Sequence, residues 1–111
     1  QCGSCKILVN GKSTNSCMIP ISSIVDAEII TLEGLTTNKG KLHAVQQAFV
    51  DEQAAQCGYC LNGMVMTAVG LLNSNSNPDE MEIKTALQGN LCRCGTHTRI
   101  IRAIKTAAKS L

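Results

Sequence analysis

The chain has 111 residues with seven cysteines, one Phe, one Tyr and no Trp, and ten basic against eight acidic side chains leave a net charge of +2. Because the basic residues are scattered, the chain lacks the basic patch typical of a nucleic-acid-binding protein. Two aromatic side chains are also too few to stack against a series of bases. No apolar run approaches the roughly 20 residues of a membrane span. Because a chain of this size buries a modest core, the cysteines are candidates for additional support from metals or cross-links.

The first third of the chain is rich in β-forming residues. A short strand is predicted at residues 6–9, Asn10-Gly11 is the strongest two-residue hairpin signal, and residues 12–15 return along the strand. A second β-branched run covers residues 28–32 and ends at Gly34. Since isolated hairpins are marginal in water, we expect more sheet upstream of the first residue.

The rest of the chain is predicted to be helical after a polar, glycine-containing linker at residues 37–42. Apolar side chains recur three and four positions apart, which predicts helices over residues 43–54, 58–72, 79–87 and 98–109. Asn77 suits the N-cap of the third helix and Pro78 its first position. We therefore predict an α+β chain, with a small sheet followed by a small bundle of four helices.

The seven cysteines divide into two sets that follow these two regions. The first set has three thiols, and the second has four, in two close pairs: Cys2, Cys5 and Cys17, then Cys57/Cys60 and Cys92/Cys94. Each pair of the second set lies where a loop enters a predicted helix. Free N–H groups and the positive end of the helix dipole lower thiol pKa values there and favour an anionic metal–sulfur centre. Clustered cysteines without histidine at ligand spacing indicate zinc or an iron–sulfur cluster.

Two alternatives stay open from the residues alone. A structural zinc site in an interaction module normally has two C-x₂-C pairs, whereas one residue separates Cys92 from Cys94. A dithiol oxidoreductase at Cys57/Cys60 would need a strand before the motif, whereas helix-like sequence precedes it. An iron–sulfur cluster is therefore the leading interpretation of the second set.

The first set matches part of a known spacing. Plant-type [2Fe-2S] proteins use C-x₄-C-x₂-C and a distant fourth cysteine. Cys2 and Cys5 match the C-x₂-C portion, Cys17 is the distant cysteine, and the first ligand would lie five residues before Cys2, upstream of the chain. Two groups of four cysteines, with one of the eight lying upstream of this chain, would explain why the chain has seven cysteines. Gly3, Gly58 and Gly95 would let the backbone approach the sulfur atoms.

These motifs occur together in one known family. Gln1-Cys2-Gly3-Ser4-Cys5, Ala55-Gln56-Cys57-Gly58-Tyr59-Cys60 and Gly89-Asn90-Leu91-Cys92-Arg93-Cys94-Gly95 follow one another in family order and spacing. Over nearly its whole length the chain resembles the small iron–sulfur subunit of the molybdenum hydroxylases, the family of xanthine dehydrogenase, aldehyde oxidoreductase and carbon monoxide dehydrogenase. It is most similar to the separate small subunits of bacterial hydroxylases that act on aldehydes or N-heteroaromatics. The resemblance implies that the N-terminal part of the family's fold is missing before Gln1.

The resemblance implies two domains and two [2Fe-2S] clusters. Residues 1–36 would be the C-terminal part of a ferredoxin-like β-grasp domain, and residues 43–111 a four-helix bundle. The proximal cluster would bind to Cys57, Cys60, Cys92 and Cys94. The distal cluster would bind to Cys2, Cys5, Cys17 and a cysteine upstream of Gln1.

The resemblance also implies a large molybdopterin-binding partner subunit, with Gln56 and Cys94 lying against the pterin. Electrons from substrate hydroxylation in that partner would pass through the two clusters to an external acceptor, such as an FAD or cytochrome subunit or protein. This chain would be an oxidoreductase subunit with no catalytic residue of its own. We expect a cytoplasmic location, with the periplasm as the alternative, since labile clusters and free thiols need reducing conditions during assembly.

Overall fold

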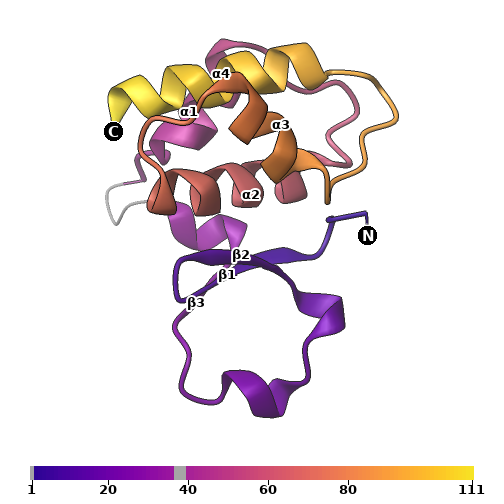
Figure 1. Ribbon diagram of the computed structural model, residues 1–111, viewed down its shortest axis with the longest axis vertical. Helices are drawn as coiled ribbons and strands as arrows, with labels where there is room; N and C mark the ends of the chain where they lie inside the picture. Colours follow the sequence, from indigo (N-terminus) through magenta and orange to yellow (C-terminus); the bar gives the residue numbers. More distant parts are fainter. Residues whose placement is uncertain (1, 37–39) are drawn as a thin grey trace.

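The computed structural model describes residues 2–36 and 40–111, and within these ranges three strands precede four helices (Figure 1). The strands are β1 (Lys6–Val9), β2 (Lys12–Asn15) and β3 (Ile29–Ile30), and the helices are α1 (Ala44–Asp51), α2 (Leu61–Ser74), α3 (Glu80–Leu87) and α4 (His97–Ser110). The α+β prediction is confirmed. Gln1 and residues 37–39 of the predicted linker lie outside the described residues.

The sheet is antiparallel with the order β2-β1-β3. Leu8 of the central strand pairs with Ser13 on one side and with Ile30 on the other. Asn10 and Gly11 have φ values of 52° and 83°, which is the backbone of the predicted two-residue hairpin turn. The third strand is shorter than predicted because the chain turns into a 3₁₀ helix at Leu32–Leu35.

Helix α2 lies between the sheet and the other helices, as Figure 1 shows. It is therefore buried on nearly every side from Gly63 to Val69. Met64 and Met66 are fully buried, as expected of residues that fill an irregular core. Leu8 is the buried contribution of the sheet to this core, which also contains Ile83 and Ile100. The core thus joins the sheet to the helices.

Two helices are shorter than the apolar pattern predicts. Helix α2 begins at Leu61 rather than at residue 58, because Gly58 has a φ of 81° and holds the preceding residues in a loop. Helix α1 ends at Asp51 rather than at residue 54, because Gln53 has a φ of 53° in the left-handed region. In both places the apolar spacing continues along the sequence, but a residue in the left-handed conformation ends the helix.

The prediction that Asn77 caps the third helix and Pro78 begins it is wrong. Asp79 is the N-cap, and its carboxylate accepts the N–H of Glu82 at 2.8 Å. The Glu82 carboxylate in turn accepts the N–H of Asp79 at 2.9 Å. This capping box satisfies two donors at once, which a single Asn cap cannot do.

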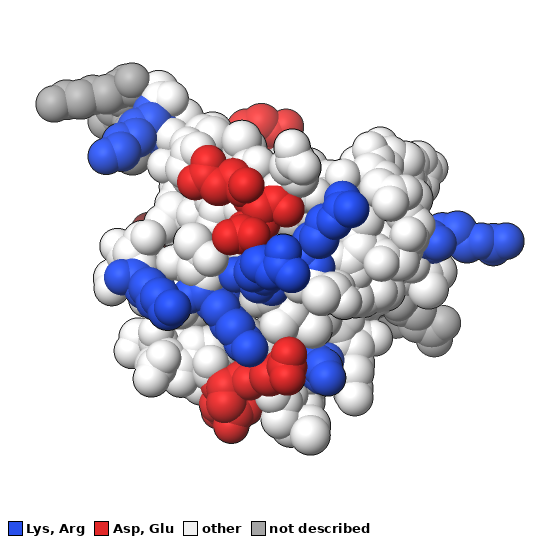
Figure 2. Space-filling view, turned by 90° about the horizontal axis from the view of Figure 1, so that it is seen from above, with Lys and Arg blue, Asp and Glu red and all other residues white. Residues whose placement is uncertain are grey.

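The surface carries mixed charge. Figure 2 shows the face that lies at the top of Figure 1, where basic side chains have acidic groups on both sides. Among the described residues, no helix combines the length and the apolar character needed to cross a membrane.

Candidate metal-thiolate site

Two loops bring the four cysteines of the second set together. One loop connects α1 to α2 and carries Cys57 and Cys60, and the other connects α3 to α4 and carries Cys92 and Cys94. The Sγ atoms of Cys57 and Cys94 are 3.5 Å apart. The thiols of Cys60 and Cys92 also lie near each other, since each shifts the pKa of the other. Each loop therefore contributes one cysteine to each of two thiol pairs.

Two glycines shape these loops. Gly58 follows Cys57 with a φ of 81°, and Gly95 follows Cys94 with a φ of 73°. A Cβ on either glycine would meet no described atom within 4 Å, so the requirement is for backbone conformation and not for space. The left-handed conformation costs other residues roughly 1–2 kcal/mol. The turn after Cys57 directs the N–H of Tyr59 to the Cys57 Sγ at 3.5 Å.

Burial and hydrogen bonds shift the pKa values of three of these thiols, Cys57, Cys60 and Cys92. Burial opposes ionisation of Cys92, but the hydroxyl and the backbone N–H of Thr96, followed by the Cys60 thiol, lower the pKa of Cys92 to about 6. Burial, and then the bond to Cys92, raise the pKa of Cys60 to about 11. The N–H of Tyr59, and then the Cys94 thiol, lower the pKa of Cys57. Cys57 and Cys92 thus have lowered pKa values, which favours the thiolate form that binds metals.

The first set is only partly assembled in this structure. The backbone N–H of Cys17 donates to the Cys5 Sγ at 3.5 Å, and this bond together with one from the Cys17 thiol lowers the pKa of Cys5 to about 7. The bond to Cys5 raises the pKa of Cys17. The Cys2 thiol bonds to the hydroxyl of Ser4 at 3.4 Å, which lowers the pKa of Cys2.

A cleft connects the two sets. It has a volume of about 200 Å³, and cysteines of both sets lie among its lining residues: Cys2, Ser4, Cys57, Tyr59, Cys60, Leu91, Cys92 and Arg93. Tyr59 and Leu91 are 86% and 71% exposed, so the rim of the cleft is unusually apolar for a surface. Gln56 lies exposed beside Cys57 on this side of the molecule, and Arg93 lies between Cys92 and Cys94.

The donor set of the second group fits a two-iron centre. Within residues 2–36 and 40–111, no three His, Cys, Asp or Glu side chains converge as the ligands of one metal ion. The second set instead presents two pairs of thiols, and a [2Fe-2S] cluster takes four cysteines, two on each iron. The pairs lie near the N-termini of α2 and α4, where the helix dipole favours negative charge.

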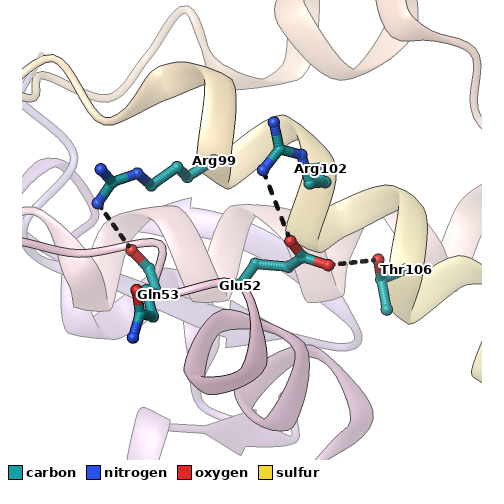
Figure 3. Close-up of polar contacts among 5 residues, drawn as sticks. All are labelled: Glu52, Gln53, Arg99, Arg102 and Thr106. Carbon is teal, nitrogen blue, oxygen red and sulfur yellow. Dashed lines mark hydrogen bonds and ion pairs between the residues drawn. The ribbon is translucent and has the colours of Figure 1, made fainter.

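A polar network fastens α4 to the loop that carries Cys57 (Figure 3). The Arg99 guanidinium donates to the carbonyl of Gln53 at 3.4 Å. The Glu52 carboxylate accepts the Thr106 hydroxyl at 3.3 Å and pairs with Arg102 at 3.9 Å. Sequence reasoning missed this network, because Glu52 follows an exposed acidic residue and has the pattern of a solvated helix face.

Comparison with known proteins identifies the family. The family described as "[2Fe-2S] binding domain" matches residues 31–105. The chain is 50% identical to one of the subunits of the nicotinate dehydrogenase of Pseudomonas putida, over 99% of this chain and 69% of that protein. It is 43% identical to the alpha subunit of the isoquinoline 1-oxidoreductase of Brevundimonas diminuta, over 97% of this chain and 70% of that protein. The crystal structure of quinoline 2-oxidoreductase from Pseudomonas putida 86 superposes with a TM-score of 0.88 at 39% identity, covering 98% of this chain and 68% of that one.

The chain belongs to the small iron–sulfur subunits of the molybdenum hydroxylases. The resemblance seen in the motifs is thereby confirmed, and so is the class of the protein as an iron–sulfur subunit of an oxidoreductase. The zinc module and the dithiol oxidoreductase receive no support from these matches. The ligand roles of the individual cysteines remain predictions.

Two polar residues near this iron–sulfur site have no counterpart in the sequence predictions. Thr96 is buried and bonds to Cys92, and Asn90 is buried between the two cysteine sets. A threonine before an apolar helical run signals an N-cap, so the position of Thr96 was detectable but its sulfur partner was not. Asn90 follows a helix in a stretch that resembles an ordinary turn, and no local pattern marks it as buried.

Proposed function

We propose that this subunit passes electrons from the molybdopterin centre of a large partner subunit to an external acceptor through two [2Fe-2S] clusters. The convergence of four thiols from two loops carries the proposal: the Sγ atoms of Cys57 and Cys94 are 3.5 Å apart, and Cys60 and Cys92 lie near enough to shift each other's pKa. When bound, such a cluster supplies one-electron transfer. The family match supports the same class of cofactor.

The proximal cluster is assigned to Cys57, Cys60, Cys92 and Cys94. Thr96 holds Cys92 in a readily ionised state, and the turn at Gly58 directs the N–H of Tyr59 toward a ligand sulfur. The distal cluster is assigned to Cys2, Cys5 and Cys17, with a fourth cysteine upstream of Gln1. The bond between Cys5 and the N–H of Cys17 supports the pairing of two of these three residues.

The two clusters correspond to two proposed domains. Residues 1–36 form the C-terminal part of a ferredoxin-like β-grasp domain, residues 37–42 the linker, and residues 43–111 a four-helix bundle. The exposed apolar side chains Met18, Ile21 and Val25 are close together in sequence and support a larger first domain, which would cover them.

The partner covers the rim of the cleft between the cysteine sets. Gln56 and Cys94 lie against the pterin in this assignment, and Tyr59, Leu91 and Arg93 form the surrounding contact. A rim with large exposed side chains flanking the thiols supports a protein interface there, since such surfaces mark interaction sites. An FAD or cytochrome subunit or protein is the proposed acceptor, and the cytoplasm is the proposed compartment.

The proposed substrate class is N-heteroaromatic rather than aldehyde. The names of two relatives at 50% and 43% identity refer to nicotinate and isoquinoline, and a superposed structure at 39% identity is a quinoline oxidoreductase, whereas two superposed aldehyde oxidoreductases are 34% identical. The substrate itself binds in the partner, so the test belongs to the complex. Nicotinate, quinoline or isoquinoline is expected to bleach the cluster absorbance of the anaerobic complex, and reduction by benzaldehyde alone would contradict this class.

The cluster assignment is tested in the complex of the full-length subunit with its large partner. We expect four irons and four acid-labile sulfides per subunit, two for each [2Fe-2S] centre, and two distinct electron paramagnetic resonance signals after reduction with dithionite. Cys92→Ser is expected to remove one signal and Cys17→Ser the other, because each removes a ligand of a different cluster. A complex that contains zinc without labile sulfide, or that loses the same signal in both variants, would contradict the proposal.

A further inference from the structure

Asn90 occupies a buried position between the two cysteine sets. It is 8% exposed and stands two residues before Cys92. Its side-chain N–H donates to the hydroxyl of Thr67 in the middle of α2 at 2.9 Å, and Thr67 is itself 4% exposed. The loop that carries Cys92 is therefore fixed to the central helix by a buried side-chain bond.

The other end of the Asn90 amide faces the turn that carries Cys2 and Cys5. A Cβ added to Gly3 would collide with the Asn90 oxygen and would lie 2.8 Å from the carbonyl of Gly89. A Cβ added to Gly63 of α2 would lie 2.7 Å from the same Asn90 oxygen. The turn and α2 thus approach the Asn90 side chain so closely that only glycine fits at residues 3 and 63.

The Asn90 oxygen is buried and has no hydrogen-bond partner among the described residues. A buried acceptor without a partner is unfavourable for stability, and an apolar residue of similar size would avoid this cost. Positions where a residue departs from such local rules are often those with a functional requirement. The identity of Asn90 therefore needs an explanation other than core packing.

The backbone next to Asn90 joins the two cysteine sets directly. The N–H of Leu91, which precedes Cys92, donates to the carbonyl of Cys2 at 2.9 Å. Asn62 of α2 fixes the other side of the same turn, since its amide donates to the carbonyls of Ser4 at 2.7 Å and Lys6 at 3.2 Å. A single hydrogen bond thus connects a residue of the first set to the neighbour of a residue of the second.

We propose that Asn90 is a positioning residue that sets the separation of the two iron–sulfur clusters by fixing the Cys92 loop to α2, so that the neighbouring Leu91 N–H can hold the Cys2 turn against that loop. It acts through the backbone bond between Leu91 and Cys2, since its own side-chain bond goes to Thr67. The inference rests on the proposed function, because it requires both clusters. Since electronic and magnetic coupling between two centres decreases with their separation, loss of the Asn90 bond weakens the coupling while both clusters remain bound.

The test measures this coupling in the complex of the full-length subunit with its large partner. In the dithionite-reduced wild-type complex, we expect the magnetic interaction of two nearby reduced clusters to split their resonance signals. Asn90→Ala is expected to retain wild-type iron and labile sulfide contents and both signals, but to lose the splitting. Unchanged splitting at full iron content in Asn90→Ala would overturn the role of Asn90.

Asn73→Ala is the matched control for a general loosening of the interface. Asn73 lies on the same helix, and its amide donates to the carbonyl of Gly11 at 3.0 Å across the same boundary, away from the cysteines. This variant is expected to keep the wild-type splitting. An equal loss in Asn73→Ala and Asn90→Ala would show that any interface bond has this effect and would overturn the specific role.

A second pair of variants decides the matter if Asn90→Ala does not assemble. Thr67→Val removes the acceptor of the Asn90 bond with little change in shape, whereas Thr67→Ser keeps the hydroxyl. Narrowed splitting in Thr67→Val with wild-type splitting in Thr67→Ser would support the proposal, and identical spectra would overturn it. A wild-type complex with one cluster signal would instead overturn the two-cluster function, a result distinguishable from the failure of Asn90 alone.

Discussion

At the scale of single residues, short polar side chains define the surroundings of the thiols. Thr96 occupies the N-cap position of α4, but its hydroxyl bonds to Cys92 at 3.3 Å and makes no cap bond to a described residue. Ser4 bonds to Cys2 in a similar way. Sequence spacing predicted that the cysteines of the second set gather, but it did not predict the hydroxyl groups that bond to the thiols. A Ser or Thr hydroxyl near a cysteine can bond either to a backbone N–H or to the sulfur, and the sequence does not decide between the two.

His43 has a structural role at the start of α1 that the sequence did not specify. Its Nδ1 accepts the N–H of Val45 at 3.1 Å, and its own N–H donates to Gln46 at 2.9 Å, so it caps α1. Burial lowers the pKa of His43 below its ordinary value. Protonation of the ring would also remove the lone pair that accepts the Val45 N–H.

We therefore expect the stability of the protein to depend on pH through His43. The unfolded chain takes up this proton near pH 6.5 and the folded chain only at lower pH, so stability is fully present above about pH 6.5 and decreases as the pH falls below it. His43→Asn replaces the ring with a cap that does not titrate and should flatten this decrease. Urea midpoints between pH 5 and pH 8 measure the effect, and a wild-type slope in His43→Asn would contradict it.

At the scale of elements, apolar period predicted the helices well and their ends poorly. The core faces of α2 and α4 follow the expected spacing, with Met64, Ala68 and Ile100, Ile104 buried. The start of α2 and the end of α1 depend on the left-handed backbone conformation of Gly58 and Gln53. The spacing of apolar residues carries no information about that conformation. The 3₁₀ helix at Leu32–Leu35 was missed because its β-branched, apolar neighbours favour a strand in isolation.

Helix α2 also approaches the sheet closely at Gly70. A Cβ at this position would lie 2.8 Å from the backbone nitrogen of Ser13 in β2. Alanine normally stabilises a helix interior by about 1 kcal/mol relative to glycine. In this contact we expect the opposite sign, because the sheet would have to move away from the helix.

Gly70→Ala is predicted to lower the free energy of unfolding by roughly 1–3 kcal/mol, the usual effect of overpacking. Urea denaturation of the full-length protein measures this change. Gly89→Ala is the matched control, since its Cβ would meet only the flexible end of Lys6 at 3.7 Å, and it should stay within about 0.5 kcal/mol of wild type. A higher free energy of unfolding in Gly70→Ala would contradict this prediction and show that the sheet can move away from α2 without loss of stability.

At the scale of the whole molecule, the candidate site is held by two loops rather than by regular structure. Residues far apart in sequence, Cys57 and Cys94, meet through side-chain contacts of the loops, and the network of Glu52 and Arg99 ties one loop to α4. The motifs predicted that these thiols gather. The contacts that hold the loops are long-range, so no local pattern could have indicated them.

Removal of iron and sulfide is therefore expected to loosen the loops more than the core. A bound cluster links the two loops and stabilises the folded state by its binding free energy. In hydrogen exchange, residues 52–60 and 88–96 should lose protection in the cluster-free protein, while Met64, Ile100 and their neighbours on α2 and α4 keep most of theirs. Equal loss of protection across the core would show that the helices themselves depend on the cluster.

The exposure of the cleft also has a consequence for the order in which the mature protein is built. Cys2 and Cys57 are open to solvent, and Cys60 and Cys92, which pack against the core, line the same open cleft. A donor that delivers iron and sulfide can therefore reach the thiols of the already folded chain. Any protein that later covers the rim at Tyr59 and Leu91 would close this entrance, so we expect the clusters to be loaded before the subunit docks.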